Sequence, residues 1–190
     1  MSFTVWFTGL SGAGKTTLSS RLFEAMQQRG QAAELLDGDV IRRNFSQELN
    51  FSREHRHIQG KRVGFVCHLL NKHSVACVAA LITPYAETRQ ANRLLIQNYV
   101  QVYLRCSMEE LTRRDPKGLY KRALAGEIKN FTGVSDPFEE PVASDIVVDT
   151  AQQTVDESLA RIVARLEELE HLPPGPGGQP GLDPREQEAK

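Results

Sequence analysis

The sequence is poor in three features that would by themselves indicate a location or a partner: cysteines, long apolar runs and an excess of charge of one sign. Only three cysteines occur in 190 residues, an odd number without close pairs. Neither a disulfide framework nor a cysteine-rich zinc site is therefore expected. The low cysteine content instead predicts a reducing, cytoplasmic location. No apolar stretch approaches the roughly 18 residues of a membrane span, and the N-terminus lacks the pattern of a secretory leader. No membrane partner is predicted.

Charge is nearly balanced, with 23 Lys and Arg residues against 24 Asp and Glu residues and a formal net charge of -1. Proteins that bind nucleic acid through bulk electrostatics usually carry a basic excess. No nucleic-acid partner is therefore predicted, and an anionic ligand has to be bound by a few well-placed cationic side chains.

The length and the 40% content of hydrophobic residues fit one globular domain. From residue 171 the composition changes, because HLPPGPGGQPGLDPREQEAK is nearly half proline and glycine and offers few apolar side chains for burial. We predict a folded domain over residues 1–170 and a disordered tail over residues 171–190.

Short apolar runs alternate with helical patterns along the domain. Strands are predicted at residues 4–8, 32–36, 75–82, 99–104 and 145–148. The run at 75–82 is apolar throughout, which is typical of a strand covered on both faces and predicts a central place in the sheet. Helices are predicted up to Gly30 as the C-cap, from Ser52 as the N-cap, at about residues 87–97, and from the capping boxes Ser107/Glu110 and Thr154/Glu157. This alternation predicts an α/β fold, a parallel sheet with helices on both faces.

The first predicted strand runs directly into Gly9-Leu10-Ser11-Gly12-Ala13-Gly14-Lys15-Thr16, which fits G-x-x-x-x-G-K-[ST] and precedes a helical pattern. In this context the motif predicts a P-loop NTPase three-layer sandwich, because the backbone amides and the helix N-terminus form a phosphate site. Lys15 is expected to bridge the β- and γ-phosphates of ATP, and the Thr16 hydroxyl to bind Mg²⁺. The predicted ATP-binding residues are Gly9, Leu10, Ser11, Gly12, Ala13, Gly14, Lys15, Thr16 and Thr17.

A regulatory GTPase would need a D-x-x-G element followed by an N-K-x-D guanine clamp. Residues 115–118 (DPKG) and 71–74 (NKHS) imitate the two, but their order is reversed and the second has no aspartate. The small size instead favours a small-molecule kinase with an acceptor site and a basic lid.

The stretch LLDGDVIRR places two carboxylates one glycine apart after an apolar run. An alcohol acceptor has a pKa far above 7, so a carboxylate that takes its proton assists phosphoryl transfer. Asp39 is the candidate base. Asp37 is better placed to hold Mg²⁺ through water or to share the orientation of the hydroxyl, and the sequence leaves open which of the two is the base.

Five blocks follow GLSGAGKTT in the order DGDVIRR, LNFSREHR, LITPYAETRQANR, RDPKGLYKRA and KNFTGVSDPFEEP. With them, residues 4–150 closely resemble the adenylylsulfate kinases (APS kinases). The resemblance implies transfer of the γ-phosphoryl group of ATP to the 3′-hydroxyl of adenosine 5′-phosphosulfate (APS), giving PAPS and ADP. It also implies a P-loop kinase core with a mobile lid, and a homodimer.

The resemblance further implies roles for single residues. Arg42 and Arg56 match arginines that bind the phosphosulfate, Phe51 and Phe131 match the aromatics that sandwich the adenine, and Lys117 matches a lid lysine near the phosphates. The remaining lid cations, Arg113, Arg114, Lys121 and Arg122, fit a solvated helix face as well as they fit ATP contact. The predicted APS-binding residues are Asp39, Arg42, Phe51, Arg56, Gln59, Ile82, Thr83, Lys117 and Phe131; the predicted catalytic residues are Asp39, Lys15, Asp37, Lys117 and Thr83.

Three positions depart from the family pattern. His55 replaces an aspartate before Arg56, Gln59 takes the position of an asparagine, and Thr83 replaces a serine that is often described as a phosphoserine intermediate. A covalent role of Thr83 is not expected, because in-line transfer needs only Mg²⁺, Lys15 and an oriented acceptor. A kinase for another small acceptor, such as a sugar acid or another nucleotide, and a non-catalytic nucleotide-binding subunit are the alternative functions.

Overall fold

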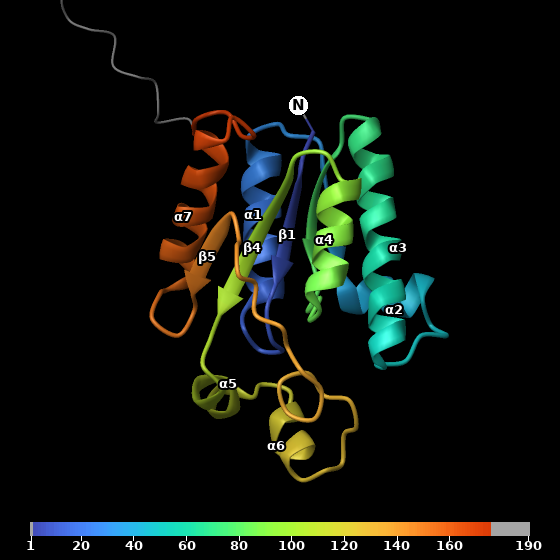
Figure 1. The fold of residues 1–190 in the computed structure, drawn as a ribbon. Coiled ribbons are helices and arrows are strands. Elements are labelled where there is room, and N and C mark those ends of the chain that lie inside the picture. The colour runs from blue at the N-terminus through green and yellow to red at the C-terminus, as the bar shows by residue number, and fades with distance from the viewer. Residues whose placement is uncertain (1, 176–190) are drawn as a thin grey trace, which may run out of the picture.

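The computed structural model describes residues 2–175 as a parallel five-stranded sheet in the order β2-β3-β1-β4-β5, with helices on both sides (Figure 1). The strands are β1 (Thr4–Thr8), β2 (Ala33–Asp37), β3 (Ala76–Ala80), β4 (Tyr99–Arg105) and β5 (Ile146–Asp149). The helices are α1 (Lys15–Gln28), α2 (Gly38–Phe45), α3 (Arg53–Lys72), α4 (Ala86–Leu95), α5 (Met108–Arg114), α6 (Leu119–Leu124) and α7 (Val155–Glu168). The predicted α/β fold class is confirmed.

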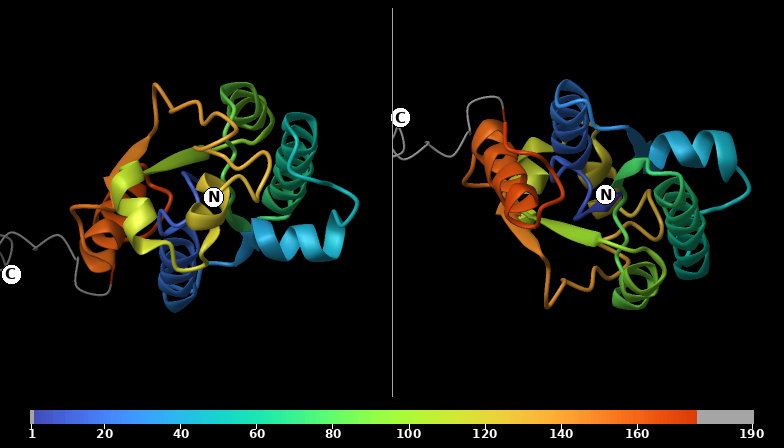
Figure 2. Two further views of the ribbon diagram at one scale, coloured as in Figure 1. Left: turned by 90° about the horizontal axis from the view of Figure 1, so that it is seen from below. Right: turned by 90° about the horizontal axis from the view of Figure 1, so that it is seen from above.

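Alternate residues of β1 face opposite sides of the sheet. Val5 and Phe7 pack in one apolar cluster with α1 and α7, whereas Trp6 packs in a second cluster with Val63 and Cys67 of α3. Figure 2 shows the helices on the two sides of the sheet. Because both faces are covered, every residue of β3 is buried, as its continuous apolar sequence predicts. The predicted central place needs correction: β3 is an interior strand that pairs with both β2 and β1, but the central strand is β1.

One local prediction also needs correction, and one helix was not predicted. Ser107 does cap α5 by accepting a hydrogen bond from the Glu110 amide, but the Glu110 carboxylate binds Arg113 and Arg114 and so does not complete a capping box. Helix α2 was not predicted, because it is only eight residues long and none of its residues is buried.

The folded domain extends past its predicted end at residue 170. The His171 ring stacks on Phe3 with ring centroids 5.0 Å apart, and Leu172 is buried in the larger apolar cluster. Leu172 of the predicted tail therefore belongs to the core, and the half-buried His171 packs against it through Phe3. Residues 176–190 of that tail lie outside the described residues.

The glycine-rich loop after β1, the start of α2, the loop after β3 and the segment with α5 and α6 all lie at the carboxyl edge of the sheet (Figure 1). Parallel α/β sheets usually bind ligands at this edge. Gly9 makes the first turn possible, because its φ is +149° and a Cβ there would lie 2.7 Å from the Leu104 carbonyl oxygen. Within residues 2–175, no helix is both long and apolar enough to cross a membrane.

Candidate active site

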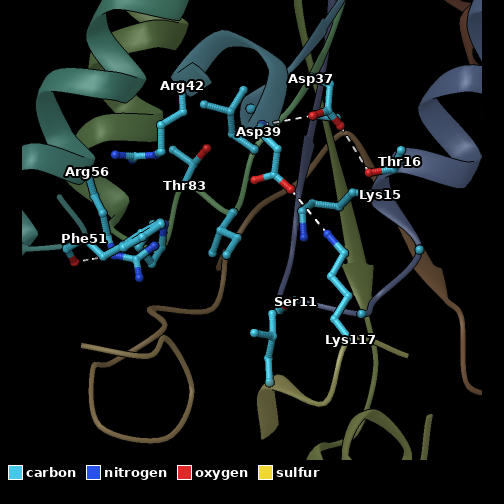
Figure 3. Close-up of a pocket in the computed structure, with 18 of the residues that line it drawn as sticks. Ser11, Lys15, Thr16, Asp37, Asp39, Arg42, Phe51, Arg56, Thr83 and Lys117 are labelled. Carbon is cyan, nitrogen blue, oxygen red and sulfur yellow. Dashed lines mark hydrogen bonds and ion pairs between the residues drawn. The ribbon is translucent and has the colours of Figure 1, made fainter. Parts of the chain in front are cut away.

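A cavity of about 330 Å³ opens at the carboxyl edge of the sheet. Fifteen of the residues predicted from the sequence line it: Ser11, Gly12, Gly14, Lys15, Thr16, Thr17, Asp37, Asp39, Arg42, Phe51, Arg56, Gln59, Ile82, Thr83 and Lys117. Figure 3 shows Asp39 between the group around Lys15 and Thr16 and the group around Arg42, Phe51 and Arg56. Residues spread over more than a hundred positions of sequence thus meet in one cavity.

The glycine-rich loop folds around the amine of Lys15. The Lys15 Nζ donates to the carbonyl oxygens of Gly9 at 2.9 Å and Leu10 at 2.7 Å. Neither of these two residues nor Ala13, which is fully buried, lines the cavity with the other predicted ATP-binding residues. Their part in the site is to shape the loop and to hold the lysine.

Burial lowers the pKa of Lys15 from 10.5 to about 8, and the nearby carboxylates Asp39 and Asp37 oppose this shift. The ammonium has therefore exchanged hydration for a small number of fixed partners. A buried ammonium with few partners interacts strongly with an additional anion, so the site favours the binding of a phosphate.

Asp37 connects the two motifs. Its Oδ1 accepts from the backbone amides of Asp39 at 2.9 Å and Val40 at 3.2 Å, which caps α2, and its Oδ2 accepts from the Thr16 hydroxyl at 3.1 Å. Because the Thr16 hydroxyl donates its hydrogen bond to Asp37, the lone pairs of the hydroxyl oxygen face other ligands. Hard oxygen donors of this kind suit Mg²⁺.

Asp39 lies in the first turn of α2, and its carboxylate is 76% exposed. Its partner is Lys117 of the α5–α6 segment, with 3.3 Å between Nζ and Oδ2. The glycine between the two aspartates has a steric reason, because a Cβ on Gly38 would lie 3.1 Å from Leu81 Cγ and 3.2 Å from the Ala80 carbonyl oxygen. Close contact with the end of β3 sets the positions of both carboxylates.

Two guanidinium groups flank the ring of Phe51, which is 53% exposed. Arg42 lies 4.6 Å and Arg56 5.3 Å from the ring centroid. Arg42 donates to the carbonyl oxygens of Leu49 and Asn50, and the desolvation of both arginines lowers their pKa values from the usual range. The arrangement presents two fixed cations over a half-exposed aromatic ring, which suits a ligand with an anionic group and a flat ring.

Arg56 also links the helix α3 to the loop before β5. Its Nη2 donates to the Asn130 carbonyl oxygen at 2.8 Å, and its Nε lies 3.8 Å from Asp136. Phe131, which follows Asn130, does not line the cavity and packs edge-on against Tyr120 with ring centroids 5.0 Å apart. The second predicted aromatic is therefore near the site but not part of its wall.

The basic lid segment is largely neutralised by its own acidic residues. Arg113 and Arg114 bind Glu110, and Arg122 binds Glu127. Lys121 does not line the cavity, whereas Lys117 does. Of the lid cations considered from the sequence, only Lys117 therefore faces the ligand site.

Gln59 is 3% exposed, and neither its amide nitrogen nor its amide oxygen has a hydrogen-bond partner within residues 2–175. A buried amide without partners is costly, so it marks a place for a polar ligand group. The neighbouring departure, His55, is used within the protein, because its Nδ1 accepts from the Asn50 amide at 2.9 Å.

Sequence reasoning missed three side chains that shape the site. The hydroxyl of Tyr120 donates to the Ser11 carbonyl oxygen at 2.8 Å, and the buried Arg89 donates to that of Thr83 at 2.8 Å. The indole of Trp6 donates to the Thr83 hydroxyl at 2.9 Å. No local pattern predicts these contacts, although Trp6 is the single tryptophan of the chain and precedes the glycine-rich loop.

The sequence model of the adenylylsulphate kinase family matches residues 1–149. Over 171 residues the chain is 48% identical to a probable bifunctional SAT/APS kinase 2 of Sorangium cellulosum, of which it spans 29%. It is 44% identical to an adenylyl-sulfate kinase of Picosynechococcus, with 90% of this chain and 97% of the relative covered.

Among solved structures, the fold is similar to that of the Mycobacterium tuberculosis APS kinase CysC in complex with AMPPNP and APS. The TM-score is 0.83 and the identity 33%, with 87% of this chain and 98% of that chain covered. A hexameric APS kinase from Thiobacillus denitrificans is similar over 91% of this chain and 30% of its own, with a TM-score of 0.71 and 31% identity. A gluconokinase from Sinorhizobium meliloti, at 18% identity and a TM-score of 0.58, shares the fold alone.

Proposed function

The chain belongs to the adenylylsulphate kinase family, and we propose on this premise that it transfers the γ-phosphoryl group of ATP to the 3′-hydroxyl of APS, giving PAPS and ADP. The observation that carries the proposal is the single cavity in which a phosphate loop and a second anion site flank one carboxylate, Asp39. A phosphoryl donor and an acceptor that is itself anionic need such a pair of sites.

ATP occupies the side of the glycine-rich loop. The amides of this loop and the Lys15 ammonium bind its β- and γ-phosphates, and the burial that lowers the pKa of Lys15 strengthens this attraction. Mg²⁺ would bind on this side, where the Thr16 hydroxyl and, through water, Asp37 would hold it. It would neutralise charge on the transferred group.

APS occupies the side of Arg42 and Arg56. The two guanidiniums bind its phosphosulfate, and the exposed face of Phe51 stacks on its adenine. Gln59 supplies hydrogen bonds from its unpaired amide.

Asp39 accepts the proton of the 3′-hydroxyl as the new O–P bond forms. Its exposure supports this role, since within residues 2–175 the carboxylate is bonded to the Lys117 side chain alone and to no backbone amide. Asp37 cannot serve equally well, because both of its oxygens already accept hydrogen bonds that hold α2 and Thr16. Once Asp39 has taken up the proton, its ion pair with Lys117 is lost, and the Lys117 ammonium is free to bind the transferred phosphoryl group.

The proposal includes a homodimer in the cytoplasm. Phe65 and Leu69, one turn apart on α3, are 53% and 41% exposed and offer an apolar contact surface. All three cysteines are free, which fits a reducing compartment. Light scattering of the purified chain checks the dimer, which requires twice the mass of 21.2 kDa.

The test of the reaction is ADP release from ATP and Mg²⁺ with a panel of acceptors: APS, AMP, shikimate and gluconate. Activity with APS alone is the expected result. Activity only with another acceptor would show that this acceptor, and not APS, is the substrate. A folded, ATP-binding protein without activity on any acceptor would favour a non-catalytic nucleotide-binding role.

A further inference from the structure

The central strand β1 contributes one polar contact to the acceptor side of the cavity. Trp6 is fully buried, and its indole Nε1 lies 2.9 Å from the Thr83 hydroxyl oxygen, which belongs to a residue 77 positions further along the chain. Thr83 is 6% exposed and lines the cavity beside Ile82 and Gln59. The tryptophan itself does not line the cavity, and its indole N–H reaches the lining through Thr83.

The chemistry of the two groups fixes the direction of this bond. An indole nitrogen carries one hydrogen and no available lone pair, so Trp6 donates and Thr83 accepts. The bond uses a lone pair of the threonine oxygen and leaves its own hydrogen free. Within residues 2–175, no protein acceptor takes that hydrogen. The remaining O–H is therefore available to a ligand in the cavity that Thr83 lines.

The backbone of Thr83 is held as firmly as its side chain. Its φ of +41° is unusual for a β-branched residue and has to be stabilised by surrounding contacts. The buried Arg89 donates to the Thr83 carbonyl oxygen at 2.8 Å, and the Thr8 hydroxyl donates to that of Ile82 at 2.7 Å. The Thr83 methyl faces Gly60 of α3, where an added Cβ would lie 3.9 Å from it. Both γ-substituents thus have defined places.

We infer that Trp6 is a positioning residue for the acceptor site: its indole N–H fixes the Thr83 hydroxyl so that this hydroxyl donates a hydrogen bond to an anionic oxygen of APS. The inference rests on the proposed function and adds Trp6 to it. Thr83 is in this account a hydrogen-bond donor and not a phosphoryl acceptor.

A nucleophilic role would need a different environment. A threonine oxygen that attacks phosphorus must lose its proton to a base within hydrogen-bond distance. Among the residues that the structure describes, no carboxylate or imidazole is hydrogen-bonded to the Thr83 hydroxyl, and its only such partner is the indole, which is a donor. The hydroxyl therefore has no base beside it to take its proton, which argues against a nucleophilic role.

A double-mutant cycle tests the inference. Thr83→Val keeps the β-branched shape and removes the hydroxyl, Thr83→Ser keeps the hydroxyl, and Trp6→Phe removes the N–H but keeps an aromatic ring. Thr83→Val is expected to raise KM for APS about tenfold to a hundredfold, the effect of losing one hydrogen bond to a charged acceptor. Trp6→Phe is expected to raise it about twofold to tenfold, because the hydroxyl remains but rotates freely. Thr83→Ser should stay close to wild type.

The decisive result is the coupling between the two sites. In the Thr83→Val background, Trp6→Phe should change KM for APS no further, and KM for ATP should stay constant in all variants. Additive effects, or an unchanged KM in Trp6→Phe, would overturn the inference. A purely structural role of Trp6 would alter both KM values or the fraction of folded enzyme.

A second measurement serves if Trp6→Phe does not fold. Trp6 is the single tryptophan, so its emission reports its own environment. APS should change that emission in the wild type and in Thr83→Ser but not in Thr83→Val; an unchanged emission in the wild type, or label on Thr83 after incubation with radiolabelled ATP, would refute the account. Failure of the wild type to phosphorylate APS would instead refute the proposed function, which separates the two ideas.

Discussion

Replacing Asp39 with asparagine removes the proposed base with little effect on folding. The carboxylate is 76% exposed, and its partner Lys117 is 67% exposed, so the lost ion pair changes the free energy of unfolding by at most about 1 kcal/mol. Loss of a general base lowers kcat by about 10²- to 10⁴-fold, which corresponds to roughly 3–5 kcal/mol of activation free energy. The loss of rate is therefore expected to exceed what destabilisation could cause.

The assay measures kcat for PAPS formation, with folding checked by circular dichroism and ATP binding by calorimetry. Asp37→Asn is the matched control, because asparagine caps helices about as well as aspartate and α2 should be kept. Raised Mg²⁺ should partly restore Asp37→Asn but not Asp39→Asn. An Asp39→Asn enzyme that folds, binds ATP and turns over near the wild-type rate would refute the reasoning. If raised Mg²⁺ restored Asp39→Asn but not Asp37→Asn, Asp39 would be the metal ligand and Asp37 the base.

Two further predictions concern groups whose burial has a cost. The pKa of Lys15 is about 8 in the folded state and 10.5 usually, so the unfolded chain holds the proton more tightly. In the absence of nucleotide, the free energy of unfolding is compared with that of Lys15→Met. The difference should be constant below pH 8 and should rise by on the order of 3 kcal/mol between pH 8 and pH 10.5. Urea unfolding of both proteins across this window checks the prediction, and parallel pH profiles would contradict it. Gln59→Met replaces the unpaired buried amide by an apolar side chain of similar size, so it should raise the free energy of unfolding by about 1–2 kcal/mol and also raise KM for APS. A lower free energy of unfolding would show that the amide has partners in solution.

The phosphate loop and the interior strand could be predicted because their signals are local. The glycine-rich motif specifies a backbone conformation within eight residues, and the apolar run of β3 specifies burial on both faces. Helix α2 carries no such signal. The same Asp37 that suggested a metal site also caps this short polar helix, and only the structure shows both uses.

The acceptor side depends on contacts between distant segments, which the sequence pattern does not contain. Trp6 and Thr83 are 77 residues apart, and the reason for Gly38 is the approach of β3, not the conformation of a turn. Phe131 was predicted as part of the adenine site, yet its ring packs on Tyr120, because contacts of its loop set its position. Which residues line a site follows from tertiary packing more than from motif membership.

The most direct test of the proposed function is identification of the product formed from ATP, Mg²⁺ and APS by the purified chain. Phosphorus NMR of the mixture should show ADP and a new phosphomonoester at the 3′ position of APS, in equal amounts. ADP with free inorganic phosphate, or a phosphomonoester at any other position, would contradict the proposed transfer.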